Sequence, residues 1–425
     1  MLTIEGNIVN IDKTSRGRIE IGGDGLILSV GKETGSADIV LKDELIFPGF
    51  IDLHVHAREC ADHTQDYKED FLTAGQAAIN GGVVAFAEMP NNPTPPITDE
   101  SYNEKKALSE KSIAEVILYA GTTPTTKPLS FKVPYKIYIS KSVGDLFFDS
   151  FKELDSFLVE YEERNISFHC EDPKILKSSI EQPTHEKRRP PEAEISAVDF
   201  ALQTIEKHNL IGRICHCSTM EAMEKIVEAK KRGVKVTAEV TPHHLYFDEE
   251  SQSSAPIHRP ISGQPINGHA THLSRMLQIN PPIRQTKKNR LALIAALKKG
   301  DLDYLGTDHS PHTIEEKEKG ISGMPHLDTY GPFTTWLIKE HGFTPEDIAR
   351  VCSYNPGNFI NSFTDKKYGK IEQGFIGSLT VIDIEHPITI EKSMLKTKAG
   401  WSPFEGVEFP GRVAYTIIKG KIYKA

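Results

Sequence analysis

Apolar strand-like runs alternate with helix-like runs from about residue 50 to about residue 350. In the first run, residues 50–55, apolar and polar side chains alternate with the period of two that is typical of a strand. About eight strand–helix units fit into this stretch, and such alternation indicates parallel strands covered by helices. The sequence therefore predicts an α/β fold built on a (β/α)8 TIM-type barrel.

The individual elements of this barrel can be placed from the same patterns. We expect helices over residues 70–79, 101–111, 147–164, 193–208, 219–232 and 291–299. We expect strands over residues 50–56, 83–89, 114–119, 135–139, 166–170, 212–217, 234–240 and 305–308. Residues 250–270, which are rich in Ser, Pro, Gly and His, predict a surface excursion.

Both ends of the chain have a different pattern from the middle. Residues 2–47, and those after about residue 371, contain short alternating runs separated by turns, which predict antiparallel strands. We expect the two ends to form one small β-sandwich that flanks the barrel, with Pro48-Gly49 as the joint. The predicted domains are residues 1–48 with 355–425 for the β unit, and 49–354 for the barrel.

Charge and cysteine content exclude several classes of protein. The net charge is -9 with both signs mixed, so we expect neither a nucleic-acid surface nor a membrane surface. No apolar run approaches the roughly 20 residues that span a bilayer, and the first residues do not read as a signal peptide. The five cysteines show no disulfide pattern, and Cys215-His216-Cys217 lacks the C-x-x-C pairs of a zinc finger. We expect a cytoplasmic protein that acts on a small molecule.

Polar side chains gather at the C-terminal ends of the predicted strands, where the chemistry of such barrels is found. These residues are His54, His56, Lys136, His169, His216 and Asp308. A single histidine of this kind is often a hydrogen-bonded core residue, and a bare His-x-His is a weak signal. Six such groups at strand ends favour a metal site, because neutral imidazole and carboxylate are common ligands. Nitrogen and oxygen donors without clustered thiolates suit zinc, with manganese and cobalt as alternatives.

Lys136 is the unusual member of this set, because an ammonium would repel divalent cations. One interpretation is a strand lysine that pairs with an acid or extends to solvent. The other is a lysine carbamate formed with CO2, which is anionic and can bridge two metal ions. The residues alone leave both interpretations open.

Short motifs are distributed over nearly the whole chain. They are Asp52-Leu-His-Val-His-Ala-Arg58-Glu, Met89-Pro-Asn91-Asn-Pro-Thr-Pro-Pro, Lys136-Ile-Tyr-Ile, His169-Cys-Glu-Asp, Cys215-His-Cys-Ser-Thr, Thr241-Pro-His-His-Leu, Asn280-Pro-Pro-Ile-Arg284, Gly306-Thr-Asp308-His-Ser-Pro-His312 and Ser402-Pro-Phe-Glu-Gly. Together they resemble the dihydroorotases, a branch of the amidohydrolase superfamily. The resemblance implies a barrel with a flanking β domain, which agrees with the pattern of elements.

The resemblance also implies a role for each matching residue. His54 and His56 would bind one metal ion, His169 and His216 a second, and carbamylated Lys136 would bridge the two. Asp308 would bind the first metal and act as general acid and base. The residues implied to bind substrate are His56, Arg58, Asn91, Asn280, His312 and Gly323. Outside these motifs, Asn91 would read as a turn residue and Arg58 as half of a surface ion pair.

The implied activity is the reversible cyclisation of N-carbamoyl-L-aspartate to L-dihydroorotate in pyrimidine biosynthesis. Hydroxide generated at two divalent metals would attack the ring amide, and Asp308 would transfer the proton. An allantoinase or hydantoinase would share the metal ligands, but Arg58, Asn91 and Asn280 argue against that alternative. A metal-free paralogue acting as a partner subunit is disfavoured because all six ligand positions are filled. A homo-oligomer and an aspartate carbamoyltransferase partner are left open.

Two departures from the family pattern bear on the site. His326 occupies a position where the family usually has glycine, so contacts from the loop around Gly323 are in doubt. Residues 140–145 lack the paired aspartates seen in members that use an acid in place of Lys136. The second departure favours the lysine as the bridging residue.

Overall fold

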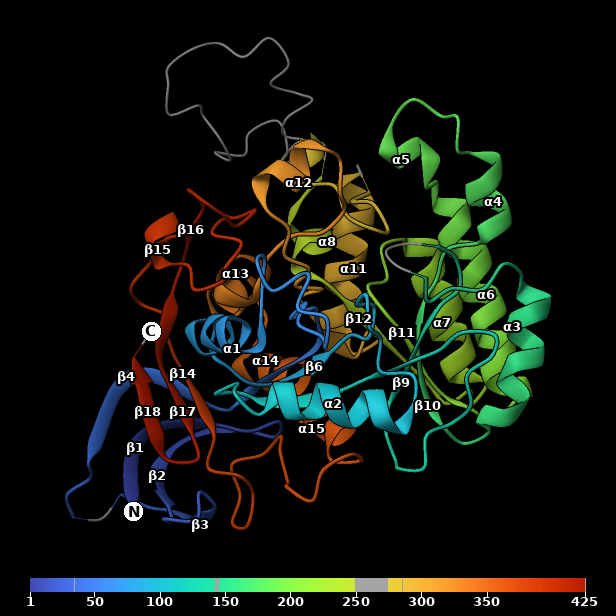
Figure 1. Cartoon of the computed structure of the whole chain (residues 1–425). Coiled ribbons are helices and arrows are strands. Elements are labelled where there is room, and N and C mark those ends of the chain that lie inside the picture. Colours follow the sequence, from blue (N-terminus) through green and yellow to red (C-terminus); the bar gives the residue numbers. More distant parts are fainter. Residues whose placement is uncertain (34, 142–144, 249–273, 285, 425) are drawn as a thin grey trace.

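The structure, a computed structural model, describes residues 1–33, 35–141, 145–248, 274–284 and 286–424. Within these residues, eight successive strand positions form the predicted (β/α)8 barrel (Figure 1). They are β5 (Phe50–Val55), β6 (Val83–Glu88), β7 (Glu115–Leu118) continued by β8 (Ala120–Gly121), β9 (Tyr135–Tyr138), β10 (Asn165–His169), β11 (Ile211–Ile214), β12 (Val236–Val240) and β13 (Tyr304–Leu305). The predicted surface excursion at 250–270 lies outside the described residues.

Neighbouring barrel strands pair in parallel, from β5 with β6 round to β12 with β13. The circle closes where His309, just beyond β13, forms a parallel bridge with Val55. Across this bridge the His309 N–H donates to the His54 carbonyl at 3.2 Å, and the His56 N–H donates to the His309 carbonyl at 2.7 Å. Because all eight strands run in one direction, their C-terminal ends meet at one rim.

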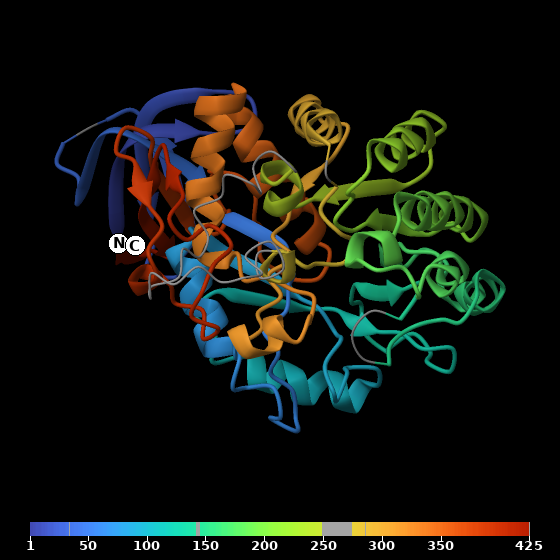
Figure 2. The same ribbon diagram turned by 90° about the horizontal axis from the view of Figure 1, so that it is seen from above.

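Helices cover the outside of the barrel, most visibly on the side away from the chain ends (Figure 2). The described helices are α1 (Phe71–Asn80), α2 (Asp99–Ser109), α3 (Phe151–Leu158), α4 (Pro173–Ser178), α5 (His185–Arg188), α6 (Pro191–Lys207), α7 (Met220–Lys231), α8 (Pro242–Tyr246), α11 (Lys287–Lys299), α12 (Ile314–Glu318), α13 (Tyr330–His341), α14 (Pro345–Ala349) and α15 (Asn355–Ile360). Short turns of helix lie at η1 (Val159–Tyr161), η2 (Leu327–Thr329), η3 (Arg350–Tyr354) and η4 (Lys392–Met394). None of the helices in the described part of the chain has the length and apolarity needed to cross a membrane.

Local capping explains where several helices begin. In α1 the Asp70 carboxylate accepts the Thr73 N–H and the Thr73 side chain bonds back to the Asp70 backbone, a capping box. The helix predicted over 147–164 is shorter than expected. It begins at Phe151, because the Ser150 hydroxyl accepts the Glu153 N–H, and it tightens into η1 after Leu158.

The two chain ends form one sheet of seven strands in the order β18-β17-β14-β4-β1-β2-β3. The strands are β1 (Leu2–Val9), β2 (Thr14–Ile21), β3 (Ile27–Gly31), β4 (Ile39–Pro48), β14 (Leu379–Asp383), β17 (Arg412–Ile418) and β18 (Lys421–Lys424), with a separate pair of β15 (Ile388–Thr389) and β16 (Glu408–Phe409). β14 pairs with β4, so the ends of the chain are joined as predicted. These seven strands form one hydrogen-bonded sheet beside the short β15–β16 pair, and β1 pairs with β4 in parallel, not antiparallel as we expected.

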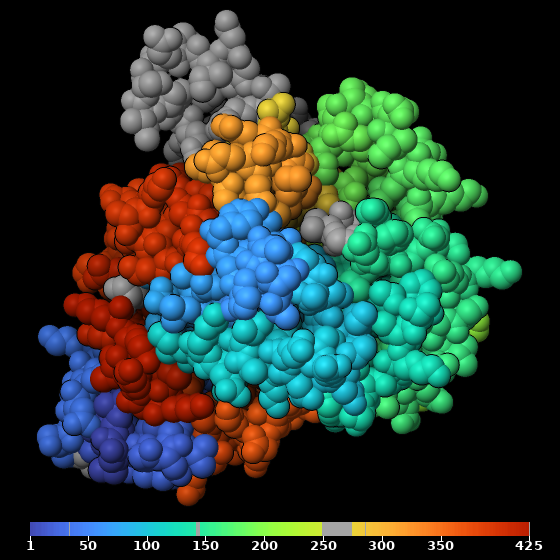
Figure 3. All heavy atoms as spheres, viewed as in Figure 1, coloured from blue at the N-terminus to red at the C-terminus, as the bar shows by residue number. Residues whose placement is uncertain are grey.

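The end sheet packs closely beside the barrel. Figure 3 shows residues near the two termini, in blue and red, together on one side of the molecule. The largest apolar core contains Phe50 and Phe86 of the barrel together with Trp401 and Phe404 from the C-terminal end. The C-terminal end therefore contributes side chains to the barrel core, and the domain limits at 48/49 and 354/355 stay a prediction.

Candidate metal centre and substrate pocket

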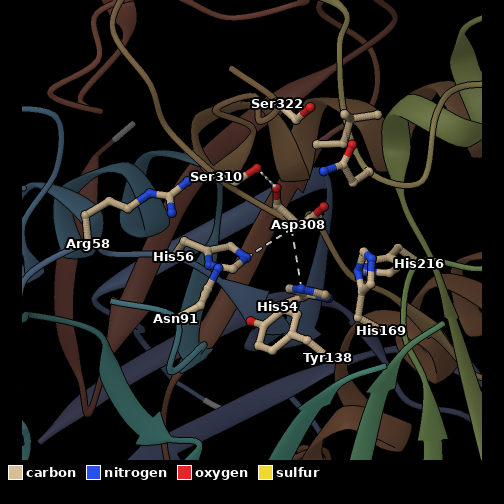
Figure 4. A pocket seen from close by; sticks show the side chains of 12 residues that line it. His54, His56, Arg58, Asn91, Tyr138, His169, His216, Asp308, Ser310 and Ser322 are labelled. Carbon is tan, nitrogen blue, oxygen red and sulfur yellow. Dashed lines mark hydrogen bonds and ion pairs between the residues drawn. The ribbon is translucent and has the colours of Figure 1, made fainter. Parts of the chain in front are cut away.

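The C-terminal ends of the barrel strands surround one cavity (Figure 4). Its lining residues are His54, His56, Arg58, Asn91, Tyr138, His169, His216, Ile279, Asn280, Asp308, Ser310 and Ser322. Eight of the eleven predicted site residues are in this set. The other three, Lys136, His312 and Gly323, lie outside the lining but close to it, as their contacts below show.

Asp308 lies at the centre of the cavity, between His54 of β5 and His56 directly after that strand. Its Oδ1 is 3.4 Å from His54 Nε2 and 3.2 Å from His56 Nε2, and Figure 4 shows both imidazoles turned toward the carboxylate. The arrangement follows from the closure of the barrel, because the segment after β13 pairs with β5. The period-two spacing of His54 and His56 places both rings on the same face of that strand.

Glu239 at the end of β12 fixes the orientation of His54. Its Oε1 accepts a hydrogen bond from His54 Nδ1 at 2.7 Å and from the His216 backbone N–H at 3.2 Å, and its other oxygen pairs with Arg213. Gly306 leaves room for this carboxylate, since an added Cβ would lie 2.6 Å from Glu239 Cδ. Burial by itself raises the pKa of Glu239, but the charge of Arg213 lowers it to about 2. A carboxylate that holds one ring nitrogen leaves the other nitrogen free for a metal.

His169 and His216 form the second half of the histidine set. His169 Nδ1 and His216 Nε2 face each other at 2.9 Å, and their ring centroids are 4.7 Å apart. The other nitrogen of His169 lies 2.8 Å from Glu171 Oε2, and Glu171 pairs with Arg189 at 2.9 Å. Each histidine therefore has a fixed ring plane, which suits a ligand with a defined lone-pair direction.

Lys136 is fully buried on β9. Its Nζ donates to Cys215 Sγ at 2.9 Å and lies 5.2 Å from the centre of the Tyr138 ring. The structure thus brings Lys136 beside the histidine set, with its amine directed at a thiol and not at a carboxylate.

The donor set fits a divalent metal ion. Burial lowers the pKa of all four histidines, that of His54 to about 3, so the imidazoles are neutral. Burial raises the pKa of the Asp308 carboxyl well above its usual range. His54, His216 and Asp308 each offer a ligand atom, and these three atoms lie within 4.8 Å of one another. Neutral imidazole nitrogens and a carboxylate oxygen at this spacing are typical of zinc sites.

Arg58 forms a cationic wall of the same cavity. It is 2% exposed, and among the described residues it makes no ion pair: its Nε donates to the Pro311 carbonyl at 3.3 Å and its Nη2 to His312 Nε2 at 3.1 Å. Glu316 and Lys68 are the further neighbours of His312: Glu316 Oε2 accepts from His312 Nδ1 at 3.0 Å, and Lys68 Nζ pairs with Glu316 Oε1 at 3.0 Å. A buried guanidinium without a carboxylate indicates a place for an anionic ligand.

The remaining predicted residues lie in or beside the cavity lining. Asn91 and Asn280 both line it, whereas Gly323 lies behind it, where an added Cβ would be 2.7 Å from His312 Cδ2. His326 points elsewhere: its Nε2 is 3.1 Å from His243 Nδ1, in a buried pair outside the cavity lining. His326 therefore does not enter the cavity, and its presence in place of glycine does not block contacts from the loop around Gly323.

Three residues of the site have strained backbone conformations. Arg58, His216 and Asp308 have positive φ angles of 65°, 36° and 49°. Such a conformation costs roughly 1–3 kcal/mol for a residue other than glycine, and it is found most often at functional sites. Its concentration around one cavity supports a functional interpretation of the cavity.

Several residues of the site were missed in the sequence. Glu239 and Tyr138 both lie in predicted strands, near their C-terminal ends. Glu171 lies two residues after His169, inside the motif His169-Cys-Glu-Asp, but was given no role. An acid at the end of a barrel strand was a usable signal for Glu239. Glu316, which holds His312, lies on a helix and had no such signal.

A barrel with imidazoles and a carboxylate at the C-terminal rim defines the class of metal-dependent hydrolases. The amidohydrolase family profile matches residues 45–423, and the chain belongs to this family. The family and the donor set together imply a divalent metal ion.

Relatives of known name cover almost the whole chain. The dihydroorotase of Pyrococcus furiosus is 30% identical over 99% of this chain and 92% of its own length. The dihydroorotase of Thermococcus kodakarensis is 31% identical over 99% of this chain and 94% of its own length. The resemblance to dihydroorotases inferred from the motifs is confirmed.

Solved structures confirm the fold. The L-hydantoinase of Arthrobacter aurescens has a TM-score of 0.85 at 20% identity and covers 99% of this chain and 95% of its own. A D-hydantoinase from a Thermus species has a TM-score of 0.82 at 22% identity over 99% and 95%. At these identities the likeness concerns the fold, a barrel with a β domain.

Proposed function

We propose that this chain is a dihydroorotase, which catalyses the reversible cyclisation of N-carbamoyl-L-aspartate to L-dihydroorotate in pyrimidine biosynthesis. One observation carries the proposal: Arg58, a buried cation without a carboxylate partner in the described residues, opens onto the same cavity as the histidine and aspartate cluster. A cyclic amide that carries a carboxylate is the kind of substrate that needs both a cation to bind the carboxylate and a metal site to cleave the amide. The named relatives support this assignment.

The residues that would hold the metals are those of the histidine set. His54, His56 and Asp308 would bind one zinc ion and His169 and His216 a second, and Lys136 as a carbamate would be a ligand of both. Bound there, divalent ions supply a water of lowered pKa and polarise the amide carbonyl. The Lys136 amine is already fully buried beside the histidines. The bridging role requires it to leave Cys215 and gain CO2.

The side chains of this protein supply proton transfer and binding. Asp308 would accept the proton of the attacking water and return it to the leaving amide nitrogen. Arg58 would bind a substrate carboxylate through its planar fork, with Asn91 and His312 completing that end of the pocket. Asn280, which lines the cavity, would contact the ring, together with the backbone at Gly323.

The alternative is an allantoinase or hydantoinase activity, since hydantoinases share this fold. Allantoin and hydantoin carry no carboxylate, so Arg58, which makes no ion pair among the described residues, would have no anionic group of the substrate to bind. An inactive paralogue is disfavoured, because all six predicted metal-ligand positions are filled and residues of the site have strained backbone conformations. A homo-oligomer, an aspartate carbamoyltransferase partner and a cytoplasmic location stay predictions.

The test is a comparison of substrates on metal-analysed protein. We expect turnover of dihydroorotate and of N-carbamoyl-L-aspartate, with allantoin and hydantoin converted far more slowly, and about two divalent ions per chain. Hydrolysis of hydantoin at a rate above that of dihydroorotate would replace the proposed function by the alternative. Protein without metal and without turnover would support the inactive paralogue.

A further inference from the structure

Tyr138 lines the metal-site cavity but has no part in the chemistry described so far. It is the last residue of β9 and lies two residues after Lys136, so both side chains are on the same face of the strand. Its side chain is among those that surround the cavity, and the residue is only 4% exposed.

The position of the Tyr138 ring is fixed by its neighbours. The centroid of the Tyr138 ring lies 5.8 Å from that of the His169 ring. Lys136 Nζ lies 5.2 Å from the centroid of the Tyr138 ring. The hydroxyl is buried, and no hydrogen-bond partner reaches it among the described residues. A buried hydroxyl without a partner is destabilising, and such groups in native proteins require an explanation. A ligand in the cavity would provide the missing partner.

The direction of the hydroxyl indicates which part of a ligand it meets. Figure 4 shows it on the side of Asn91 and His56, away from His169 and His216. That is the end of the cavity with the unpaired Arg58. A phenol hydroxyl is protonated at neutral pH and can donate a hydrogen bond.

We propose that the Tyr138 hydroxyl donates a hydrogen bond to a carboxylate oxygen of the substrate and, with Arg58, selects a carboxylated ring. This inference rests on the proposed function and adds a substrate-binding residue to it. Arg58 supplies the charge, and Tyr138 supplies a neutral, directional donor whose position does not depend on a flexible side chain.

The test is Tyr138→Phe, which removes the hydroxyl and keeps the ring. KM and kcat for dihydroorotate are measured, together with the Kd of orotate, a planar analogue that carries the same carboxylate. We expect KM and Kd to rise roughly tenfold or more, the size expected for a bond to a charged group, with kcat little changed. Metal content should match the parent and the thermal unfolding midpoint should be equal to or above that of the parent, which excludes a merely structural loss.

Tyr135→Phe is the matched control. Tyr135 is on the same strand but its hydroxyl accepts the Leu129 N–H at 2.8 Å, away from the cavity lining. This variant should leave KM and Kd unchanged, and an equal rise in both variants would overturn the inference.

Two further outcomes would also overturn it. Parent-like KM and Kd in Tyr138→Phe would mean that the hydroxyl does not touch the substrate. A fall in kcat at unchanged Kd would move the hydroxyl from the carboxylate to the reacting carbonyl. If the parent itself neither turns over dihydroorotate nor binds orotate, the proposed function fails and this inference fails with it.

Discussion

Arg58 shows how one residue can indicate a ligand. A buried guanidinium costs free energy unless its charge is compensated. The hydrogen bonds of Arg58 go to a carbonyl and an imidazole, and the carboxylates of Glu88, Asp308 and Glu316 act on its charge only from beyond ion-pair distance. Its backbone is also strained, with φ of 65°. Both costs are explained if a substrate carboxylate completes the site.

We predict that Arg58→Lys keeps its metal and loses most of its affinity for substrate. Lysine retains the charge but not the planar fork, so about 1.5–3 kcal/mol of binding should be lost. KM for dihydroorotate and metal content are the measurements. Arg290→Lys, at a partly buried ion pair with Asp248 outside the cavity lining, is the control. Parent-like affinity in Arg58→Lys would exclude the carboxylate role.

We predict that Asp308→Asn stays folded and nearly loses turnover in both directions. The amide cannot accept a proton, and positioned proton transfer contributes roughly a hundredfold to ten-thousandfold. The rates of hydrolysis and of cyclisation are measured beside Asp303→Asn, an acid paired with Lys230. If Asp308→Asn retains the parent rate, another group is the base.

We predict that Lys136→Ala loses metal and activity, and that a short carboxylic acid in solution partly restores both. The reason is that the carbamate would supply two oxygens, which a free carboxylate can imitate. Intact mass under native conditions should show an added CO2 on the parent and none on the variant. A parent that holds two metals with an unmodified lysine would contradict the bridge.

At the scale of elements, α12 connects two segments that line the cavity. Lys317 Nζ donates to the Gln278 carbonyl at 2.8 Å and to the Ile321 carbonyl at 2.9 Å. The Gly323 N–H donates to the same Gln278 carbonyl at 2.9 Å. Residues 278–280 and 320–323 are thereby held together, and they carry Ile279, Asn280 and Ser322 to the cavity.

Lys317 should also give the protein a specific pH dependence. It is fully buried without a carboxylate among the described residues, and burial lowers its pKa to about 7. Above about pH 7 the unfolded chain therefore binds more protons at this residue than the folded one, so stability rises with pH up to the unfolded pKa of about 10.4. The contribution between pH 7 and pH 9 is about 2 kcal/mol.

The measurement is the free energy of unfolding of the parent and of Lys317→Met, in urea at pH 7 and pH 9. The difference between the two proteins should shift in favour of the parent by about 2 kcal/mol at the higher pH. A difference that does not change with pH would mean that Lys317 has an ordinary pKa in the folded protein.

At the scale of the whole molecule, the C-terminal end supports the site from behind. Trp401 is fully buried, and its Nε1 donates to the His312 carbonyl at 2.7 Å. Thr397 and Lys398 bond to Glu69, which in turn contacts His309 at 3.3 Å. The backbone of His309 closes the barrel against His54 and His56. Loss of contacts in this segment should therefore affect the pocket as well as stability.

We predict that Trp401→Phe is destabilised by about 1–3 kcal/mol, because the buried His312 carbonyl loses its donor. KM for dihydroorotate should rise too, since His312 contacts Arg58. Urea unfolding and steady-state kinetics are the measurements. Trp336→Phe, at the other tryptophan of the chain, is the control for loss of an indole, and it should leave KM unchanged. An unchanged KM in Trp401→Phe would separate the C-terminal end from the pocket.

The sequence by itself determined the architecture and most of the site. The two periodicities of strand and helix are local properties, so the eight barrel units and the β nature of both ends could be predicted from them. The strand-end rule then predicted that His54, His169, His216 and Asp308 would meet, because parallel strands carry their C-terminal ends to one rim.

Only the tertiary structure decided how these groups are held. Glu239 became the partner of His54, and Trp401 that of His312, through contacts between segments 185 and 89 residues apart in the chain. Packing of distant segments also determined three further features. They are the strand directions in the end sheet, the position of the Lys136 amine beside Cys215 and the lack of a hydrogen-bond partner for the Tyr138 hydroxyl among the described residues. Local patterns state which residues are apolar or polar along one element. They do not state which distant element supplies a partner, because that depends on the packing of the complete chain.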